Sequence, residues 1–338
     1  MARRLSVIIP NRNGEQTIGR CLDAVFASPF DDFEVIVVDD CSTDRSAEII
    51  ARYPCTLIPL DRHSGASRAR NAGAARAAGE ALFFIDADCL CLPDTLSAAA
   101  RSYERDPHAV TGGTYTRIAA DDTFFSTFQS LFIHYCETKN TEPDYVATHA
   151  MVIDTAAFRK SGGFPEDFMP ILEDVEFSHR LRRSGCRLAM NPGILVRHLF
   201  NFDLGKSLGN AFRKSLYWTI YSLANRDLLR DSGTASVELK TAVFAWLLHA
   251  FLVLLWLATG RTAWLFPIPP VCAASLYINR KFLALLFDAR GISFGLRAAL
   301  YYSLLYPVAV GIGGMIGLLK YLSGYGPSLK KETSRDHV

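Results

Sequence analysis

Two aspartates one residue apart, Asp86 and Asp88, directly follow the apolar run Ala81–Ile85. Hard divalent cations such as Mg²⁺ and Mn²⁺ take one or two protein carboxylates together with phosphate oxygens of a substrate. A D-x-D string is common by itself, but this one ends a predicted buried strand that follows earlier strand–helix units. We therefore expect Asp86 and Asp88 to lie at a site for Mg²⁺ or Mn²⁺.

A second acidic pair, Asp39 and Asp40, ends the apolar run Phe33–Val38. A carboxylate at such a position can accept hydrogen bonds from a nucleotide base or from ribose hydroxyls. The polar residues Ser42–Asp44 that follow are typical of a helix cap. We expect them to cap the next helix and Asp39 or Asp40 to bind a nucleotide.

A third acidic pair, Glu173-Asp174, follows the turn-rich segment Ser161–Pro165. Acidic residues are favoured at helix N-termini because of the helix dipole, so this pair has a purely structural explanation. The functional alternative is a general base that faces the metal site.

The first two acidic pairs lie at the ends of predicted strands. In this part of the chain strand and helix patterns alternate, which predicts βαβ units and a mainly parallel sheet with helices on both faces. In such sheets the ligand site lies beyond the carboxyl ends of the strands. Three strand ends carry unusual polar residues and should converge on one crevice, namely Pro10–Asn13, Asp39-Asp40 and Asp86–Asp88. The predicted strands are 5–10, 33–38, 56–60, 81–85 and 109–116, and the predicted helices between them include 18–26 and 66–78.

The last third of the chain has a different pattern. Leu204–Ala224 reads as a basic, aromatic amphipathic helix, which suits a membrane interface or packing on the preceding domain. Thr241–Thr259 and Ala298–Leu319 are uncharged apart from a protonatable His249 and are long enough to span a bilayer. Residues 264–287 are ambiguous: they predict a broken third span, a re-entrant segment or an interfacial element.

Two spans put both chain ends in the cytoplasm, in accord with the basic residues Lys320, Lys330, Lys331 and Arg335. Three spans put that tail outside, and the charge rule alone does not decide between them. The start of the chain does not resemble a signal peptide, so we expect the N-terminal domain to face the cytoplasm.

Composition excludes some classes of protein. The 338 residues carry a net charge of +2, which gives no reason to expect nucleic acid as a partner. The eight cysteines show no paired C-x-x-C spacing and suit a reducing compartment. We expect a catalytic domain at 1–202, an interfacial helix and linker at 203–235, a membrane region at 236–322 and a polar tail at 323–338; oligomeric state stays open.

Over residues 4–200 the chain resembles the family 2 glycosyltransferases, which have the GT-A fold, a Rossmann-like α/β architecture. Departures are small: Arg12 stands where tyrosine is frequent in the family, and Cys41 where glycine is frequent. The resemblance rests on motifs in family order and spacing, namely Ser6–Pro10 with Asn13, Val37–Asp44, Gly65 with Ala69–Gly73, Gly79-Glu80 leading to Phe84–Asp88, Gly162–Phe164, Glu173-Asp174 and Arg180-Leu181.

The resemblance implies an inverting, metal-dependent transfer of a sugar from a nucleotide-diphosphate donor. Asp174, with Glu173 as the alternative, would take the proton from the acceptor hydroxyl, and His198 would approach the metal or diphosphate. Arg70 would assist the leaving pyrophosphate or form a structural salt bridge. The residues implied in donor binding are Pro10, Asn11, Asn13, Glu15, Asp39, Asp40, Arg70 and Asp86, and those implied at the metal are Asp88, Asp86 and His198.

The acceptor we expect is a lipid-linked or membrane-proximal hydroxyl, reached by a non-processive enzyme at the cytoplasmic membrane. A processive polysaccharide synthase is the first alternative, but the Gln-x-x-Arg-Trp motif expected after the base is absent between Asp174 and Trp246. An inactive sugar-nucleotide-binding membrane protein is the second. A dehydrogenase is excluded because the first strand–helix turn, Pro10–Glu15, lacks G-x-G-x-x-G.

Overall fold

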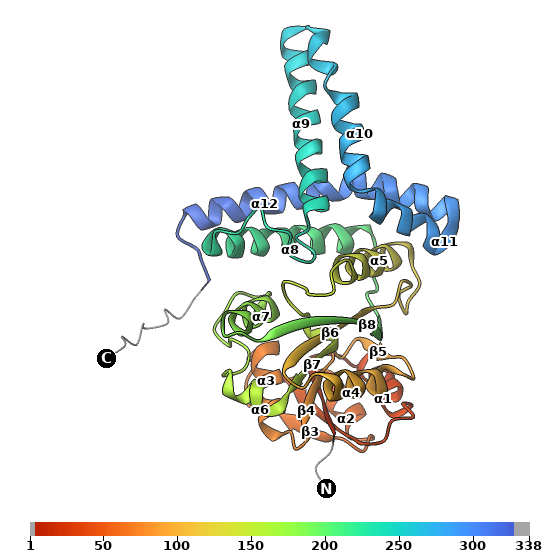
Figure 1. Cartoon of the computed structure of the whole chain (residues 1–338), viewed down its shortest axis with the longest axis vertical. Coiled ribbons are helices and arrows are strands. Elements are labelled where there is room, and N and C mark those ends of the chain that lie inside the picture. Colours follow the sequence, from red (N-terminus) through yellow and green to blue (C-terminus); the bar gives the residue numbers. More distant parts are fainter. Residues whose placement is uncertain (1–3, 328–338) are drawn as a thin grey trace.

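The computed structural model describes residues 4–327, which form an α/β body and a helical part stacked on it (Figure 1). The body contains an eight-stranded sheet in the order β3-β2-β1-β4-β7-β6-β8-β5. Its strands are β1 (Leu5–Asn11), β2 (Phe33–Asp39), β3 (Thr56–Pro59), β4 (Ala81–Phe84), β5 (Cys89–Cys91), β6 (Ala109–Tyr115), β7 (Met151–Asp154) and β8 (Arg187–His198).

The sheet is mixed, and the parallel pairing expected from the sequence dominates its N-terminal half. Strands β3, β2, β1 and β4 pair in parallel, as do β6 and β8. The pairs β4–β7, β6–β7 and β5–β8 are antiparallel. The predicted strands β1 to β4 and β6 are confirmed to within a residue or so at each end, whereas β5, β7 and β8 were not anticipated.

Helices cover both faces of the sheet, as expected, because alternate residues of each strand point to opposite faces. Leu5, Val7 and Ile9 of β1 belong to one apolar cluster, and Ile8 belongs to the other. The first cluster is shared with α1 (Ile18–Phe26), α2 (Ser46–Ile50), α4 (Thr95–Arg105) and α5 (Phe124–Thr138). The second is shared with α3 (Ala66–Arg76), α6 (Thr155–Lys160) and α7 (Glu173–Arg183).

The helical part begins with α8 (Leu204–Asn225), which matches the expected amphipathic helix. Its residues Leu216, Trp218 and Ile220 are buried together with Met169 and Val175 of the body, so this helix packs on the α/β body. It is followed by α9 (Val237–Thr259), a short 3₁₀ turn η2 (Thr262–Leu265), α10 (Ile268–Ile278), α11 (Arg280–Leu300), a π-helical turn η3 (Tyr301–Leu305) and α12 (Tyr306–Leu322).

The apolar segments of the helical part point in two directions. Helices α9 and α10 lie side by side and project away from the body, whereas α8 and α12 run across their base (Figure 1). Val237–Thr259 and Arg280–Leu322 are both long and apolar enough to cross a membrane by length and composition. The segment 264–287 is divided between η2, α10 and the start of α11. The expected basic residues Lys330, Lys331 and Arg335 lie outside the described residues.

Ala298–Leu319, expected to be one spanning helix, contains the π-helical turn and then packs closely along α8. Two glycines of α12 make this approach close. A Cβ at Gly313 would lie 2.3 Å from the backbone oxygen of Phe212, and one at Gly317 would lie 2.5 Å from that of Leu216. The Ser215 hydroxyl of α8 also donates a hydrogen bond of 2.7 Å to the Val310 carbonyl. Helix α12 is therefore held against α8 by backbone contact.

We predict that Gly313→Ala destabilises the chain, because the obstructing atom belongs to the backbone of α8 and cannot rotate away. Overpacking of this kind costs about 1–3 kcal/mol. The midpoint of thermal unfolding of the purified full chain in detergent should fall. Gly314→Ala is the matched control, since its added Cβ would meet side-chain oxygens of Ser215 and Thr219 at 3.4 Å. A Gly313→Ala chain that unfolds like the Gly314→Ala chain would contradict the close packing.

Candidate active site

The carboxyl ends of β1, β2 and β4 meet at one edge of the sheet and open into a cleft of about 530 Å³. This convergence follows from their parallel pairing, as the sequence predicted. The cleft is lined by seven of the expected site residues, Pro10, Asn11, Asn13, Asp40, Arg70, Asp86 and Asp88, and by others including Thr17, His63, Gly65 and Leu199. The other expected site residues are not among its lining residues, namely Glu15, Asp39, Glu173, Asp174 and His198.

Asp40 fixes the loop that leads into α3. Its buried carboxylate accepts hydrogen bonds from the backbone N–H groups of Ser64 at 2.7 Å and Gly65 at 2.8 Å, and it lies 2.7 Å from Nδ1 of His63. Gly65 has a φ of +87°, a conformation that favours glycine. Asp40 thus shapes one wall of the cleft while it also faces into it.

Asp39 is turned toward the first strand–helix loop. Its carboxylate accepts hydrogen bonds from Nδ2 of Asn11 at 2.8 Å and from the Ser42 hydroxyl at 2.5 Å. Ser42 therefore does not cap a helix, contrary to expectation, because its hydroxyl is bound to Asp39 four residues before α2 begins. The Asp44 carboxylate does accept from the Ser46 N–H at 3.0 Å, at the start of that helix.

Glu15 lies beside the same loop. Its carboxylate accepts a hydrogen bond from the Arg45 backbone N–H at 3.2 Å and lies 3.5 Å from Nε of Arg45. Glu15 thereby joins the chain after β1 to the chain after β2. Its described contacts are with this loop.

Arg70 connects two of the three acidic regions that the sequence singled out. It lies on α3 and is only 4% exposed. Its Nη2 is 2.7 Å from Oδ1 of Asp86 at the end of β4, and its Nη1 is 2.8 Å from Oε1 of Glu173 at the start of α7. Burial alone would raise the pKa of Asp86, but the Arg70 guanidinium holds that pKa below its usual value. The guanidinium therefore keeps Asp86 ionised and joins the start of α7 to a residue that lines the cleft.

Asp174 is the next residue of α7 and lies in a different electrostatic environment. Leu172, which precedes the pair, has a φ of +76° and turns the chain sharply into the helix. Burial and the neighbouring Glu173 charge together raise the pKa of Asp174 to about 7. A carboxyl group with this pKa exchanges a proton near neutral pH, which suits a general base. Glu173 is instead occupied by Arg70, so the environments of the two acids differ.

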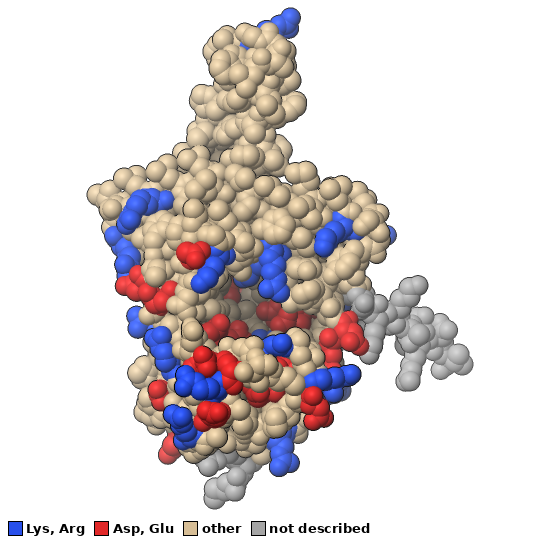
Figure 2. Space-filling model, turned by 180° about the vertical axis from the view of Figure 1, so that it is seen from behind, with Lys and Arg blue, Asp and Glu red and all other residues tan. Residues whose placement is uncertain are grey.

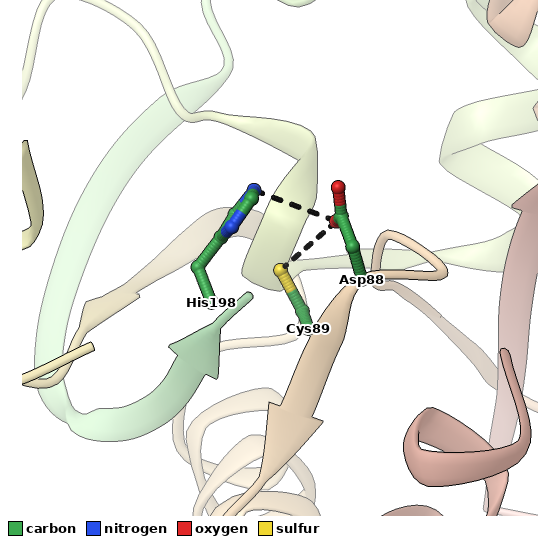
Figure 3. Close-up of side chains that lie close together, drawn as sticks. All are labelled: Asp88, Cys89 and His198. Atoms are coloured by element: carbon green, nitrogen blue, oxygen red, sulfur yellow. Dashed lines mark hydrogen bonds and ion pairs between the residues drawn. The ribbon is translucent and has the colours of Figure 1, made fainter. Parts of the chain in front are cut away.

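Asp88, Cys89 and His198 lie together at the junction of β5 and β8 (Figure 3). Antiparallel pairing places Cys89 opposite His198, and Nε2 of His198 lies 3.5 Å from Oδ1 of Asp88. Burial lowers the pKa of His198, so the neutral imidazole that metals bind is favoured. The buried Nδ1 of His198 has no hydrogen-bond partner among the described residues. Carboxylate and imidazole donors fit a divalent cation, with Asp86 two residues away.

A second polar group near the site was missed by the sequence analysis. Glu137 of α5 accepts a hydrogen bond of 2.7 Å from the Thr114 hydroxyl and lies 3.4 Å from Nε2 of His149. Burial opposes the charged form of His149, yet the Glu137 carboxylate raises its pKa above the usual value. Glu137 is the one acidic residue of Phe124–Thr138, and this is the one signal that could have indicated it.

Lys214 of α8 was also missed as a site residue. Burial lowers the pKa of its ammonium group, and the charges of Asp174 and Glu137 oppose that effect. No carboxylate among the described residues lies within salt-bridge distance of Lys214. A helix that the sequence marked only as amphipathic therefore carries a cation whose charge interacts with those of Asp174 and Glu137.

Comparison with known proteins gives a consistent family relationship for the N-terminal half. Residues 6–161 match the model of glycosyl transferase family 2. An uncharacterised glycosyltransferase of Haemophilus influenzae is 32% identical over 105 residues, which are 31% of this chain and 36% of the relative. A poly(ribitol-phosphate) beta-N-acetylglucosaminyltransferase of Staphylococcus aureus is 36% identical over 104 residues, 29% of this chain and 18% of the relative.

Among solved structures, a mannosyltransferase from Pyrobaculum calidifontis in complex with GDP-Man and Mn²⁺ is similar over 95% of this chain and 88% of its own, with a TM-score of 0.57 and 18% identity. This likeness concerns the fold, which agrees with the expected GT-A architecture. The sequence matches cover about a third or less of the first curated relatives' own lengths.

We predict that Arg70→Gln destabilises the protein, because it leaves the carboxylates of Asp86 and Glu173 without their cation. Breaking a buried ion pair costs about 3–5 kcal/mol, and the partly exposed carboxylates here place the expected loss at about 3 kcal/mol. Chemical unfolding followed by tryptophan fluorescence measures it. Arg68→Gln, on the exposed side of the same helix, is the matched control and should be nearly neutral. Equal stability of the two variants would show that Arg70 has no bridging role.

Proposed function

We propose that this chain, whose residues 6–161 belong to glycosyl transferase family 2, transfers a sugar from a nucleotide-diphosphate donor to a lipid-linked acceptor hydroxyl with inversion at the anomeric carbon. The observation that carries this proposal is the Arg70 bridge, which links the metal-binding end of β4 to the start of α7. Glu173, which makes this ion pair, is followed by Asp174, a carboxyl group with a pKa of about 7.

In the proposed reaction the acceptor oxygen attacks the anomeric carbon of the donor sugar. The new carbon–oxygen bond forms as the bond to the diphosphate breaks, and the nucleoside diphosphate leaves. Asp174 accepts the hydroxyl proton, because it is the acid whose pKa lies near neutrality. Glu173 remains paired with Arg70 and positions α7.

The donor nucleotide would bind along the strand ends. Asp40 or Asp39 would accept hydrogen bonds from the base or ribose, and Asn11 and Asn13 lie in the adjoining wall of the cleft. Asp88 and His198, with Asp86 beside them, would hold Mg²⁺ or Mn²⁺. When bound, such an ion supplies positive charge that favours departure of the pyrophosphate. The Mn²⁺ in the Pyrobaculum calidifontis mannosyltransferase structure supports this assignment.

The acceptor would reach the site from the helical part. Lys214 extends from α8 toward Asp174 and would attract the phosphate of a lipid-linked acceptor, whose sugar hydroxyl would then lie near the base. The apolar helices α9 and α10 support attachment to a membrane. We place the catalytic domain on the cytoplasmic face of the cell membrane, where nucleotide sugars are made.

The first test combines donor selection with metal binding. Purified full-length chain would be incubated with UDP-, GDP- and dTDP-sugars and Mn²⁺, and nucleoside diphosphate release would be followed; release from none of them would contradict the proposed activity. We predict that Asp88→Asn loses most turnover and weakens Mn²⁺ binding, measured by electron paramagnetic resonance. Asp94→Asn, an exposed acid nearby, is the control. Unchanged Mn²⁺ affinity in Asp88→Asn would exclude it as a ligand.

The second test concerns the base. Below pH 7 Asp174 is mostly protonated and cannot accept a proton, so the rate should rise with pH through an apparent pKa of about 7 and then level off. Asp174→Asn should lower kcat by about 10²–10⁴-fold and abolish this rise, with little change in donor affinity. Glu173→Gln should retain a rise of the rate with pH but move it to lower pH, because the substitution removes a charge that raises the pKa of Asp174. If Glu173→Gln abolishes the rise and Asp174→Asn retains it, the roles are reversed.

A further inference from the structure

The projecting pair α9 and α10 exposes an apolar surface that water would solvate poorly. Between Thr241 and Asn279 the sequence contains no Asp, Glu, Lys or Arg except Arg261 at the turn. Figure 2 accordingly shows this projection almost free of charge except for a basic side chain at its end. The large apolar side chains exposed here are Phe244, Leu247, Phe251, Leu254, Leu257, Trp264, Phe266, Leu276, Tyr277 and Ile278.

The length of the projection matches a bilayer. Helix α9 has 23 residues, which at about 1.5 Å per residue extend roughly 35 Å and exceed a hydrocarbon core of about 30 Å. The return from Thr262 to Ile278 is the described shorter apolar helix, and its 17 residues are at the lower limit for a span. Both helices expose apolar side chains and project away from the body, as expected for helices that lipid surrounds on all sides.

The chain that follows α10 returns to the body. Asp288 of α11 lies 2.8 Å from Arg117, and Arg290 forms an ion pair with Asp122. Phe294 and Tyr301 also pack against Phe124 of α5. Helix α11 is therefore on the same side of any membrane as the catalytic domain. If α9 crosses a bilayer outward, the segment that crosses back must be α10.

The remaining apolar helix, α12, starts on the side of the body and stays there. Its glycines rest on the backbone of α8, and α8 is packed on the body, so α12 cannot turn into the direction of α9 without losing these contacts. Figure 1 shows α8 and α12 crossing the base of the projection. These helices thus lie along a membrane surface if α9 and α10 cross it.

The charges at the two ends of the projection give its direction. The base carries many cations, and the tip carries Arg261. Because positive loops remain on the cytoplasmic side, the base and the body are cytoplasmic. The basic residues near the base are Arg230, Lys240, Arg280, Lys281, Arg290, Arg297 and Lys320.

We infer that α9 and α10 cross the hydrocarbon core of a lipid bilayer as a two-pass hairpin, with Thr262 beyond the far surface, and that α11 and α12 lie in the cytoplasmic interface. This differs from the two spans expected from sequence, Thr241–Thr259 and Ala298–Leu319, and makes residues 264–287 the returning span. The inference does not depend on glycosyl transfer.

Cysteine accessibility in intact cells tests the arrangement. The full chain would carry Thr262→Cys, Ala284→Cys or Ser323→Cys, three exposed positions that leave every Lys and Arg in place. A membrane-impermeant maleimide should label Thr262→Cys in intact cells. It should label Ala284→Cys and Ser323→Cys only after the cells are permeabilised. The unmodified chain gives the background from its natural cysteines, and each variant must remain in the carbonate-resistant membrane fraction.

Other outcomes would overturn the inference in identifiable ways. Labelling of Ala284→Cys in intact cells would mean that α12, not α10, is the returning span. Labelling of Ser323→Cys in intact cells would mean that α12 is a third span. Thr262→Cys that reacts only after permeabilisation would make the pair a re-entrant element. Recovery of the unmodified chain in the soluble fraction would mean that a second copy or another protein covers the hairpin instead of lipid.

Discussion

The buried guanidinium of Arg70 is the interaction on which the arrangement of the site depends. One face of the cleft comes from parallel strands, whose carboxyl ends are brought together by backbone pairing. Helix α7 does not line this cleft; it follows β7 and α6 in the chain and has no backbone pairing with those strand ends among the described residues. Arg70, which does line the cleft, joins α7 to it, because its two terminal nitrogens bind the carboxylates of Asp86 and Glu173 at once. A lysine could not make this paired contact, since it presents a point charge instead of a planar fork.

The Arg70 bridge also gives neighbouring acidic side chains different pKa values. Asp86 and Glu173 share the cation, and the pKa of Asp86 is accordingly held down. Asp174, one residue beyond Glu173, has no such direct partner, and burial beside a second carboxylate raises its pKa to about 7. Two adjacent acids thus acquire different pKa values from position alone. Lys214 of α8 adds a positive charge that interacts with Asp174 and Glu137.

The sequence predicted the parts of this molecule that local patterns govern. The apolar runs that precede Asn11, Asp39 and Asp86 predicted the position of the cleft correctly. Parallel strands have their carboxyl ends at the same edge of the sheet, whatever path the chain takes between them. It did not reveal the partners of Arg70, since Glu173 lies 103 residues away and no period links them. Glu137 and Lys214 were missed for a related reason: each lies on a helix whose pattern indicates packing, and nothing in the local sequence relates its charge to the acidic pairs.

In the helical part, hydropathy alone does not determine how the helices are arranged. Length and apolarity identified Ala298–Leu319 as a span, and by those criteria it passes. What sets its direction is the absence of side chains at Gly313 and Gly317, which lets α12 lie on the backbone of α8. Small residues carry little hydropathy signal, yet here they decide which surface a helix contacts.

The ion pairs between α11 and the body have a further consequence for how the helical part is held on the body. Arg117 and Asp288 are 52% and 69% exposed, and Asp122 is about half exposed. Exposed pairs contribute at most about 1 kcal/mol each and weaken as salt rises, over a screening length of about 8 Å at physiological ionic strength. These ion pairs therefore add only a weak, salt-dependent contribution to a contact that rests mainly on buried apolar packing, of Phe294 and Tyr301 against α5 and of α8 on the body. Raising the ionic strength would weaken the ion pairs while the apolar packing keeps the helical part in place on the α/β body.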